Sequence, residues 1–520
     1  MKKLLPFLFI IASVSLSAQS ISSEEVDILV QKAMDQFKVA GVAVAIVKDG
    51  KIIHEKGYGL KSIDTKLPVD EHTNFQIASN SKAFTTAALA ILVDQGSLSW
   101  KDKVIKYLPE FKMYNAYVTE NFLIEDLLCH RSGLGLGAGD LNSFPDGANF
   151  TIQDVLTSFQ HFKPVSPFRT KFDYDNQLYF VAGELIARVS KMPWEAFIQT
   201  KIMQPLQMNN SLASTKGVNE TTNLAIPHSA EGTTSIIRTI PLFQEMINGA
   251  AGGILSNVHD MSKWMIMQLH QGKYGDNLSK QLFTQARQKE MWRIHTVMDA
   301  YTEPRYKKHF NGYGLGWFLN DNNGNLEVSH TGGLPGMLSK VTLIPDLNLG
   351  VVILTNTESG GGYLFTAIND NIIDSYLGLQ PMDYITMYAK YLKDERDNGD
   401  LVTRKVWKTV DSNKNKTNVN PKDYTGIYQD PWFGKVEVFM KGKQLWFKSH
   451  RSPKLNGPMA FYKANTFAIK WEYQDMPADA FALFALDEEG KAQSIKMKGI
   501  SPNIDFSFDF QDLDLKRIAE

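Results

Sequence analysis

Apolar residues recur at two different spacings in the first hundred residues of the chain. Residues 23–37 form a short amphipathic pattern, and residues 79–95 place Ala, Phe, Ile and Leu at the intervals of a helix. Residues 42–47 are continuously apolar, and the dipeptide Asp49-Gly50, typical of turns, separates them from a second extended pattern at 51–59. The chain is therefore predicted to begin with a short amphipathic stretch, a strand hairpin and a long helix.

Helical spacing continues through the middle of the chain and then gives way to strand patterns. Further helices are predicted at 124–129, 152–160, 177–189, 194–204 and 260–271. Strands are predicted at 314–319, 326–329, 339–344 and 350–355, with a closing helix at 364–377. This order predicts an α/β fold in which both ends of the domain complete one sheet.

The composition changes near residue 380. Residues 390–400 are dense in charge and residues 411–420 are rich in Asn and Lys, which predicts a linker over 381–420. Beyond the linker, strands are predicted at 435–440, 444–449, 466–473, 480–486, 494–498 and 505–510. The sequence thus predicts a main α/β domain over 19–380 and a small all-β domain over 421–520.

The first residues have the pattern of a secretory signal. Lys2 and Lys3 precede apolar residues 4–14, and small residues follow at Ser15, Ser17 and Ala18. The apolar run is shorter than the roughly 20 residues of a membrane-spanning helix, which disfavours the alternative of an uncleaved anchor. We expect 1–18 to be a signal peptide and the mature protein to be periplasmic or secreted, with no stable membrane insertion.

Charge and cysteine content exclude several kinds of partner. The formal net charge of the 520 residues is -1 and no long basic tract is present, so nucleic-acid binding is not expected. Cys129 is the only cysteine, which excludes an intramolecular disulfide and a paired-cysteine metal site. No His-Glu-x-x-His pattern occurs either. No metal or other cofactor is predicted, and the oligomeric state is left open.

The start of the long helix carries a candidate nucleophile. Lys82 follows Ser79 by three residues, which places both side chains on one face of a helix. A serine hydroxyl needs a base to become nucleophilic, and a lysine can be that base when burial lowers its pKa. The alternative is a serine cap followed by a solvated lysine. Residues 83–92 are mostly apolar, which favours a buried Lys82.

A second motif, Tyr174-Asp175-Asn176, precedes the helix predicted to begin at 177. A phenol at this place can relay a proton to a leaving group, and the Asn176 amide can hold a substrate carbonyl and the lysine together. The alternative is a turn in which Asn176 caps the helix.

A third motif, His330-Thr331-Gly332-Gly333, lies between two predicted strands. Its glycines would let the backbone approach a substrate closely. The alternative is an ordinary glycine turn with an exposed histidine.

In this order, the three motifs resemble the active-site motifs of serine β-lactamases and penicillin-binding proteins, which carry Ser-x-x-Lys and Lys-Thr-Gly. The Tyr-x-Asn spacing resembles that of class C β-lactamases and D-Ala-D-Ala carboxypeptidases. Residues 127–133, 251–256 and 313–317 are also similar to that family, and the resemblance spans about 24–377. It implies a mainly antiparallel sheet flanked by helices, with an all-helical insertion. The domain over 421–520 resembles the small barrel-like modules appended to some proteins of this family.

The resemblance also implies a role for each residue. Ser79 would be the acylated nucleophile, Lys82 its proton acceptor, and Tyr174 a group for proton transfer. Substrate would bind at Asn176 and along 330–333. The backbone N–H groups of Ser79 and Gly333 would form the oxyanion hole, since the family takes its second donor from the residue after the Lys-Thr-Gly triplet.

His330 stands where the family motif has lysine. A permanent cation there helps to bind the carboxylate of a penicillin or a peptide C-terminus, whereas an imidazole with a pKa near roughly 6.5 is largely neutral. We therefore expect an exported serine hydrolase acting through an acyl-enzyme on ester, amide or peptide substrates. D,D-peptidase and β-lactamase are the alternatives, and a non-catalytic penicillin-binding or sensor protein is the alternative of another class. The role of the β domain stays open.

Overall fold

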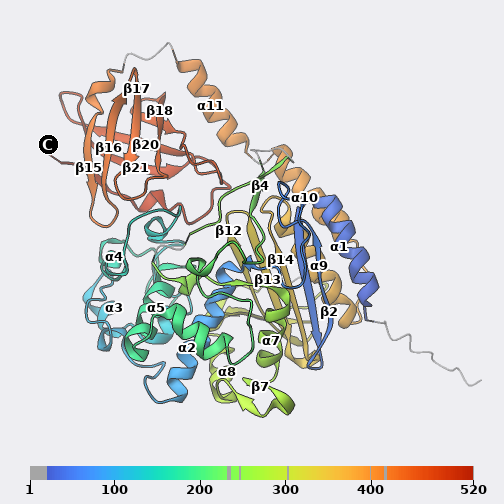
Figure 1. The fold of residues 1–520 in the computed structure, drawn as a ribbon. Helices are drawn as coiled ribbons and strands as arrows, with labels where there is room; N and C mark the ends of the chain where they lie inside the picture. The colour runs from blue at the N-terminus through green and yellow to red at the C-terminus, as the bar shows by residue number, and fades with distance from the viewer. Residues whose placement is uncertain are drawn as a thin grey trace, which may run out of the picture.

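The protein consists of an α/β domain and a C-terminal barrel, joined by two helices (Figure 1). The structure is a computed structural model that describes residues 20–230, 236–244, 247–300, 304–398, 400–414 and 419–518. The predicted signal peptide, 1–18, lies outside the described residues. Within the described residues, no helix combines the length and the apolar character needed to cross a bilayer.

The α/β domain is built on one eight-stranded antiparallel sheet with the order β2-β1-β14-β13-β12-β11-β10-β9. β1 pairs with β2 on one side and with β14 on the other, so the two ends of the domain meet in the sheet as predicted. The strands are β1 (Gly41–Lys48), β2 (Lys51–Gly59), β9 (Thr296–Met298), β10 (Asn311–Tyr313), β11 (Phe318–Asn322), β12 (Asn325–Leu334), β13 (Met337–Ile344) and β14 (Leu349–Thr355).

Both faces of the sheet are covered because successive side chains of β1 point to opposite faces. Val42, Val44 and Ile46 pack into the core formed with α1 and α9, whereas Ala43 and Ala45 belong to the larger core that includes α2, α5 and α7. The main helices are α1 (Ser23–Phe37), α2 (Ser81–Asp94), α3 (Ala116–Asn121), α4 (Ile152–Ser158), α5 (Gln177–Ser190), α6 (Trp194–Ile198), α7 (Val258–Leu269), α8 (Gln285–Met291) and α9 (Gly361–Tyr376). The observed layers confirm the predicted α/β fold.

Two elements of the α/β domain differ from the prediction. The helix predicted at 124–129 is a short 3-10 turn, Ile124–Leu127. The strand predicted at 314–319 is wrong, because β10 ends at Tyr313 and β11 begins at Phe318. Between them Gly316 has a φ of 79°, a left-handed conformation that breaks the extended backbone.

The segment predicted as a linker, 381–420, is largely helical. It contains α10 (Tyr384–Asn398) and α11 (Leu401–Asn413). Ile385 and Leu392 of α10 join the core beneath α1 and α9, and Val406 and Val410 of α11 pack onto the barrel. The helices form here because apolar residues at helical intervals lie among the charged residues of the predicted linker.

The C-terminal domain is a closed barrel of eight antiparallel strands, which confirms the predicted all-β domain. Its strands are β15 (Gly426–Asp430), β16 (Gly434–Lys441), β17 (Gln444–Ser449), β18 (Asn456–Lys463), β19 (Thr466–Ile469), β20 (Ala480–Leu486), β21 (Ala492–Gly499) and β22 (Leu515–Arg517).

The strand predicted at 505–510 is wrong. Phe506, Phe508 and Phe510 alternate with polar residues as in a strand, but the segment runs between β21 and β22 as a loop with one short 3-10 turn. The segment contacts both domains. The Phe508 ring lies 5.1 Å from the Phe144 ring, and Asp509 accepts hydrogen bonds from the amides of residues 139 and 141, whereas the Phe510 ring stacks on Trp471 of the barrel. Its aromatic residues therefore pack between the two domains and against the barrel instead of forming a strand.

Charged pairs reinforce this docking. Arg451 of the barrel donates to both carboxylate oxygens of Asp154, at 2.9 and 2.8 Å, and its guanidinium lies 3.9 Å from the centre of the Phe150 ring. Lys454 donates to Asp146 at 2.6 Å. The barrel is therefore held against the helical region of the α/β domain, beside α4 (Figure 1).

Candidate active site

The candidate nucleophile lies in a tight turn at the start of α2. Ser79 belongs to the 3-10 turn Ala78–Asn80, so the regular helix begins two residues later than predicted, at Ser81. Ala78 has a φ of 48°, a left-handed conformation that is uncommon for a residue with a side chain. This local conformation presents the Ser79 hydroxyl to a cavity while the rest of α2 is buried.

Gly332 allows β12 to lie directly against this turn. A Cβ at Gly332 would come within 2.2 Å of the Ile77 carbonyl oxygen and 3.0 Å of the Ala78 Cβ. The Ser339 hydroxyl of the adjacent strand donates to the same Ile77 oxygen at 2.7 Å and accepts a hydrogen bond from Asn80 at 2.8 Å. Only glycine permits this approach, so the third motif fixes the position of the first.

Lys82 is fully buried directly behind the serine. Its Nζ lies 3.1 Å from Ser79 Oγ, 2.7 Å from Asn176 Oδ1 and 2.9 Å from the Ala251 carbonyl oxygen. Burial lowers the pKa of Lys82 to about 7, while the carboxylates of Asp140 and Asp175 act to raise it. A substantial fraction of the amine is therefore unprotonated at neutral pH, as a proton acceptor requires.

Asn176 connects this lysine to a buried carboxylate. The residue lies immediately before α5, where its Oδ1 accepts from Lys82 and its Nδ2 donates to Asp140 Oδ2 at 2.8 Å. Burial raises the pKa of Asp140 to about 6, and hydrogen bonds from Asn176, Gln177 and Ser507 oppose that rise. The two bonds fix the orientation of the amide.

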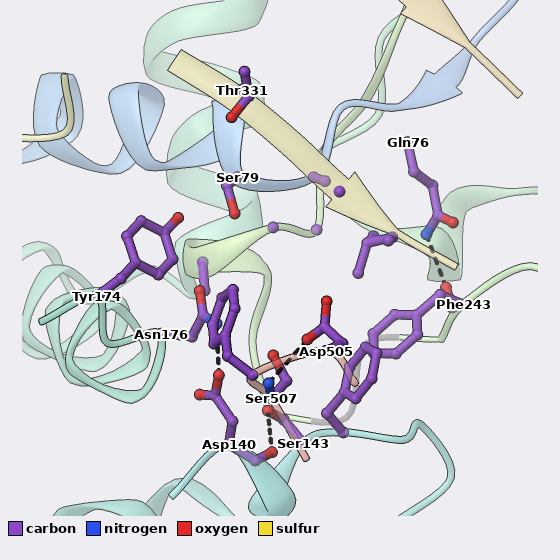
Figure 2. Close-up of a pocket in the computed structure, with 18 of the residues that line it drawn as sticks. Gln76, Ser79, Asp140, Ser143, Tyr174, Asn176, Phe243, Thr331, Asp505 and Ser507 are labelled. Atoms are coloured by element: carbon purple, nitrogen blue, oxygen red, sulfur yellow. Dashed lines mark hydrogen bonds between the residues drawn. The ribbon is translucent and has the colours of Figure 1, made fainter. Parts of the chain in front are cut away.

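Tyr174 lies close to both Ser79 and Lys82. In Figure 2 its hydroxyl points toward Ser79, and its ring centre lies 4.8 Å from Lys82 Nζ. Burial raises the pKa of Tyr174, so the phenol keeps its proton at neutral pH. The ring is supported by His130, stacked at 4.2 Å, and by Phe506 of the barrel at 5.7 Å.

The third motif lies on β12 along the same cavity. Thr331 and Gly333 are exposed to the cavity that Ser79 also lines (Figure 2). His330 is buried, with Nδ1 2.5 Å from the Thr331 carbonyl oxygen and Nε2 2.9 Å from the Tyr313 hydroxyl. Burial lowers the pKa of His330 to about 3, so this position supplies no cation at neutral pH.

These side chains border a cavity of about 360 Å³. A volume of this size suits a small organic or short peptidic ligand. Ser79, Tyr174 and Asn176 lie along one part of its wall, and Phe144, Phe180, Phe243, Leu334 and Leu338 provide apolar surface elsewhere. The structure thus brings every predicted motif to one cavity.

The barrel contributes part of the cavity wall, which the sequence did not indicate. Met476, Asp505, Phe506 and Ser507 all line the cavity that contains Ser79. Sequence reasoning also missed Asp140 and Ser339, because no motif marks them. Among the described residues, no group of three or more His, Cys, Asp or Glu side chains is arranged to hold a metal ion.

The sequence model of the Beta-lactamase family matches residues 26–370, and that of a domain of unknown function, DUF3471, matches residues 412–517. The first match covers more than half of the chain and includes all three motifs. The protein belongs to the Beta-lactamase family.

Known proteins with similar sequences fit this assignment. The chain is 26% identical over 423 residues to Unguisins hydrolase ungD' of Aspergillus campestris (strain IBT 28561), covering 79% of this chain and 76% of that protein. It is 29% identical over 343 residues to Protein flp of Staphylococcus aureus (strain MRSA252), covering 65% of this chain and 64% of that protein.

Solved structures share the fold. An octameric penicillin-binding protein homologue from Pyrococcus abyssi matches with a TM-score of 0.60 at 20% identity, covering 95% of this chain and 100% of that one. SurE matches with a TM-score of 0.55 at 16% identity, covering 95% of this chain and 99% of that one. Both likenesses extend through the α/β domain and the barrel.

Proposed function

We propose that the protein is a serine hydrolase that forms an acyl-enzyme on Ser79 with Lys82 as the base. The observation that carries the proposal is the 3.1 Å separation of Lys82 Nζ from Ser79 Oγ, combined with a Lys82 pKa lowered to about 7. A solvated lysine would hold its proton at neutral pH, whereas the Lys82 amine can both accept a proton and release it at that pH.

The reaction follows from these positions. Ser79 Oγ attacks the carbonyl carbon of the substrate while its proton moves to Lys82 Nζ. The backbone N–H groups of Ser79 and Gly333 stabilise the oxyanion by about 3 kcal/mol. Tyr174, which keeps its own proton, relays the proton of Lys82 to the leaving group as the carbon–leaving-group bond breaks. A water then attacks the acyl-enzyme, releases the carboxylic acid and restores the Ser79 hydroxyl.

The preferred substrates are esters, amides or peptides whose recognition does not depend on a carboxylate. The neutral His330 supports this preference, since β-lactams and peptide C-termini carry a carboxylate that a cation would bind. Classification of the relative ungD' as a hydrolase agrees with the reaction type. The alternatives are D,D-peptidase activity first and β-lactamase activity second.

Hydrolysis of a p-nitrophenyl ester by Ser79→Ala and Lys82→Ala tests the proposal. Both variants are expected to lose roughly 10³-fold or more of kcat/KM. Ser79→Ala activity equal to that of the wild type would overturn the proposal. Labelling of Ser79 by penicillin without turnover of any ester or amide would favour a non-catalytic binder instead.

We further propose that the enzyme acts outside the cytoplasm. The support is the charged start, apolar stretch and small residues of 1–18. Cell fractionation with mass measurement of the mature N-terminus tests this proposal. A mature chain beginning near Gln19 in the periplasmic or secreted fraction is expected, and an uncleaved chain in the membrane or cytoplasmic fraction would contradict it.

A further inference from the structure

Two carboxyl groups line the cavity away from the catalytic groups. Glu358 comes from the loop between β14 and α9, and Asp505 comes from the barrel loop that follows β21. In Figure 2 the Asp505 carboxylate points into the cavity on the side opposite Ser79. The two acids thus face the same space as the nucleophile, although they belong to different domains.

Two nearby acids, Asp475 and Asp146, have partners of opposite charge, but Glu358 and Asp505 do not. Asp475 pairs with Arg238 and Asp146 pairs with Lys454. Within the described part of the chain, neither Glu358 nor Asp505 forms an ion pair, and their polar contacts come from uncharged groups. Glu358 accepts from the Gly336 amide at 3.4 Å, and Asp505 accepts from the Ser507 amide at 2.9 Å.

The remainder of the cavity offers no compensating charge. No Lys or Arg is among the described residues that line it, and Lys82 lies behind Ser79 and Asn176. Burial and the nearby Asp505 raise the pKa of Glu358 to about 7, and burial raises the pKa of Asp505. Two ionised carboxyls in one half-buried space repel each other, and a cation bound between them relieves that repulsion.

We propose that the cavity selects substrates that carry an ammonium group, held by Glu358 and Asp505 while the scissile carbonyl lies at Ser79. This inference rests on the proposed serine hydrolase function and names its substrate class: amides, esters or short peptides of amino acids with a free amine. An ammonium has three N–H donors, enough for both carboxylates at once. The apolar wall of Phe243, Leu334, Leu338 and Met476 would pack against the rest of the substrate.

Protection of Ser79 from a fluorophosphonate tests the inference without requiring turnover. The protecting ligands are D- and L-phenylalaninamide and 3-phenylpropanamide, which is the same molecule without the amine, all at neutral pH. We expect the better amine-bearing enantiomer to protect wild-type Ser79 at a concentration roughly tenfold or more below that of 3-phenylpropanamide. Equal protection by the two kinds of ligand would overturn the inference.

Variants of Glu358 and Asp505 test whether these two carboxyls cause the preference for amine-bearing ligands. The measured quantity is the protecting concentration of 3-phenylpropanamide divided by that of the amine-bearing ligand. This ratio should fall in Glu358→Gln and in Asp505→Asn, and it should approach one in the double variant. Glu489→Gln removes an exposed carboxylate of the barrel and is the matched control, in which the ratio should stay as in the wild type. A preference that survives in the double variant would also overturn the inference.

The outcomes separate this inference from the function on which it rests. If Ser79 takes the label but the amine has no effect, the substrate class is wrong and the serine hydrolase stands. If Ser79 takes no label in the free protein, the proposed function fails and the inference fails with it.

Discussion

Asn176 connects Lys82 to Asp140 through the two ends of one amide group. Its Oδ1 lies 2.7 Å from Lys82 Nζ, and its Nδ2 donates to Asp140 Oδ2 at 2.8 Å. The lysine is therefore oriented by an amide whose own orientation is set by a buried carboxylate. Asp140 acts as a positioning residue and also as a source of negative charge close to the base.

Replacing Asp140 with asparagine should shift the pH dependence of catalysis. The Asp140 carboxylate acts to raise the pKa of Lys82, so its removal lowers that pKa. Because the unprotonated amine is the active form, the acid limb of kcat/KM should move to lower pH, by roughly one unit. A p-nitrophenyl ester measured across pH, with the exposed Asp411→Asn as control, checks this; an unmoved limb would contradict it.

Gly332→Ala should disable the site and destabilise the fold. The new methyl group would lie 2.2 Å from the Ile77 carbonyl oxygen, so β12 must move away from the nucleophile turn. We expect the free energy of unfolding to fall by about 1–3 kcal/mol in denaturant titrations, with a large loss of ester hydrolysis. Gly362→Ala, where the nearest atom is 4.0 Å away, is the matched control and should keep both properties.

Asp509→Ala should weaken the docking of the barrel and, through it, the active site. The Asp509 carboxyl accepts from the amides of Gly139 and Leu141, which flank Asp140. Leaving these buried amides unpaired should lower the free energy of unfolding by about 2 kcal/mol and reduce kcat/KM. Asp509→Asn keeps one acceptor oxygen and should recover part of the loss; equal activity in all three proteins would refute this role for the barrel.

His330→Lys should introduce hydrolysis of nitrocefin, because none of the described residues that line the wild-type cavity is a lysine or arginine that could bind its carboxylate. The neutral His330 lines the cavity close to Tyr174 and Thr331. A lysine at this position restores the motif of the β-lactamases and penicillin-binding proteins that the sequence resembles. The measurement is the initial rate of nitrocefin hydrolysis in the variant and in the wild type. An equal rate in both would contradict the idea that the missing cation prevents β-lactam hydrolysis.

The groups close to Ser79 were predictable from the sequence because each lies within a short motif. Ser79 and Lys82 are one helical turn apart, and the mostly apolar residues around them indicated a buried lysine. The sheet was predictable for a similar reason: β1 and β14 are short continuous apolar runs, typical of strands buried on both faces.

What the sequence could not predict depends on contacts between distant segments. Asp140 and Asp509 look like ordinary surface acids in the sequence, and only the fold places them beside one another. Phe506 follows a strand-like alternation, yet it lies against Tyr174 in the other domain. The helices α10 and α11 were not predicted because charged residues are interspersed with the apolar residues that pack.

The rate at which Ser79 is acylated by a fluorophosphonate, measured across pH by intact mass, tests the central claim most directly. In the wild type we predict one adduct, located on Ser79, whose rate of formation rises as Lys82 loses its proton with a midpoint near pH 7. In Lys82→Ala the adduct should form far more slowly and without that midpoint. Rapid acylation in Lys82→Ala with an unchanged pH profile, or an adduct on a different residue, would contradict the account.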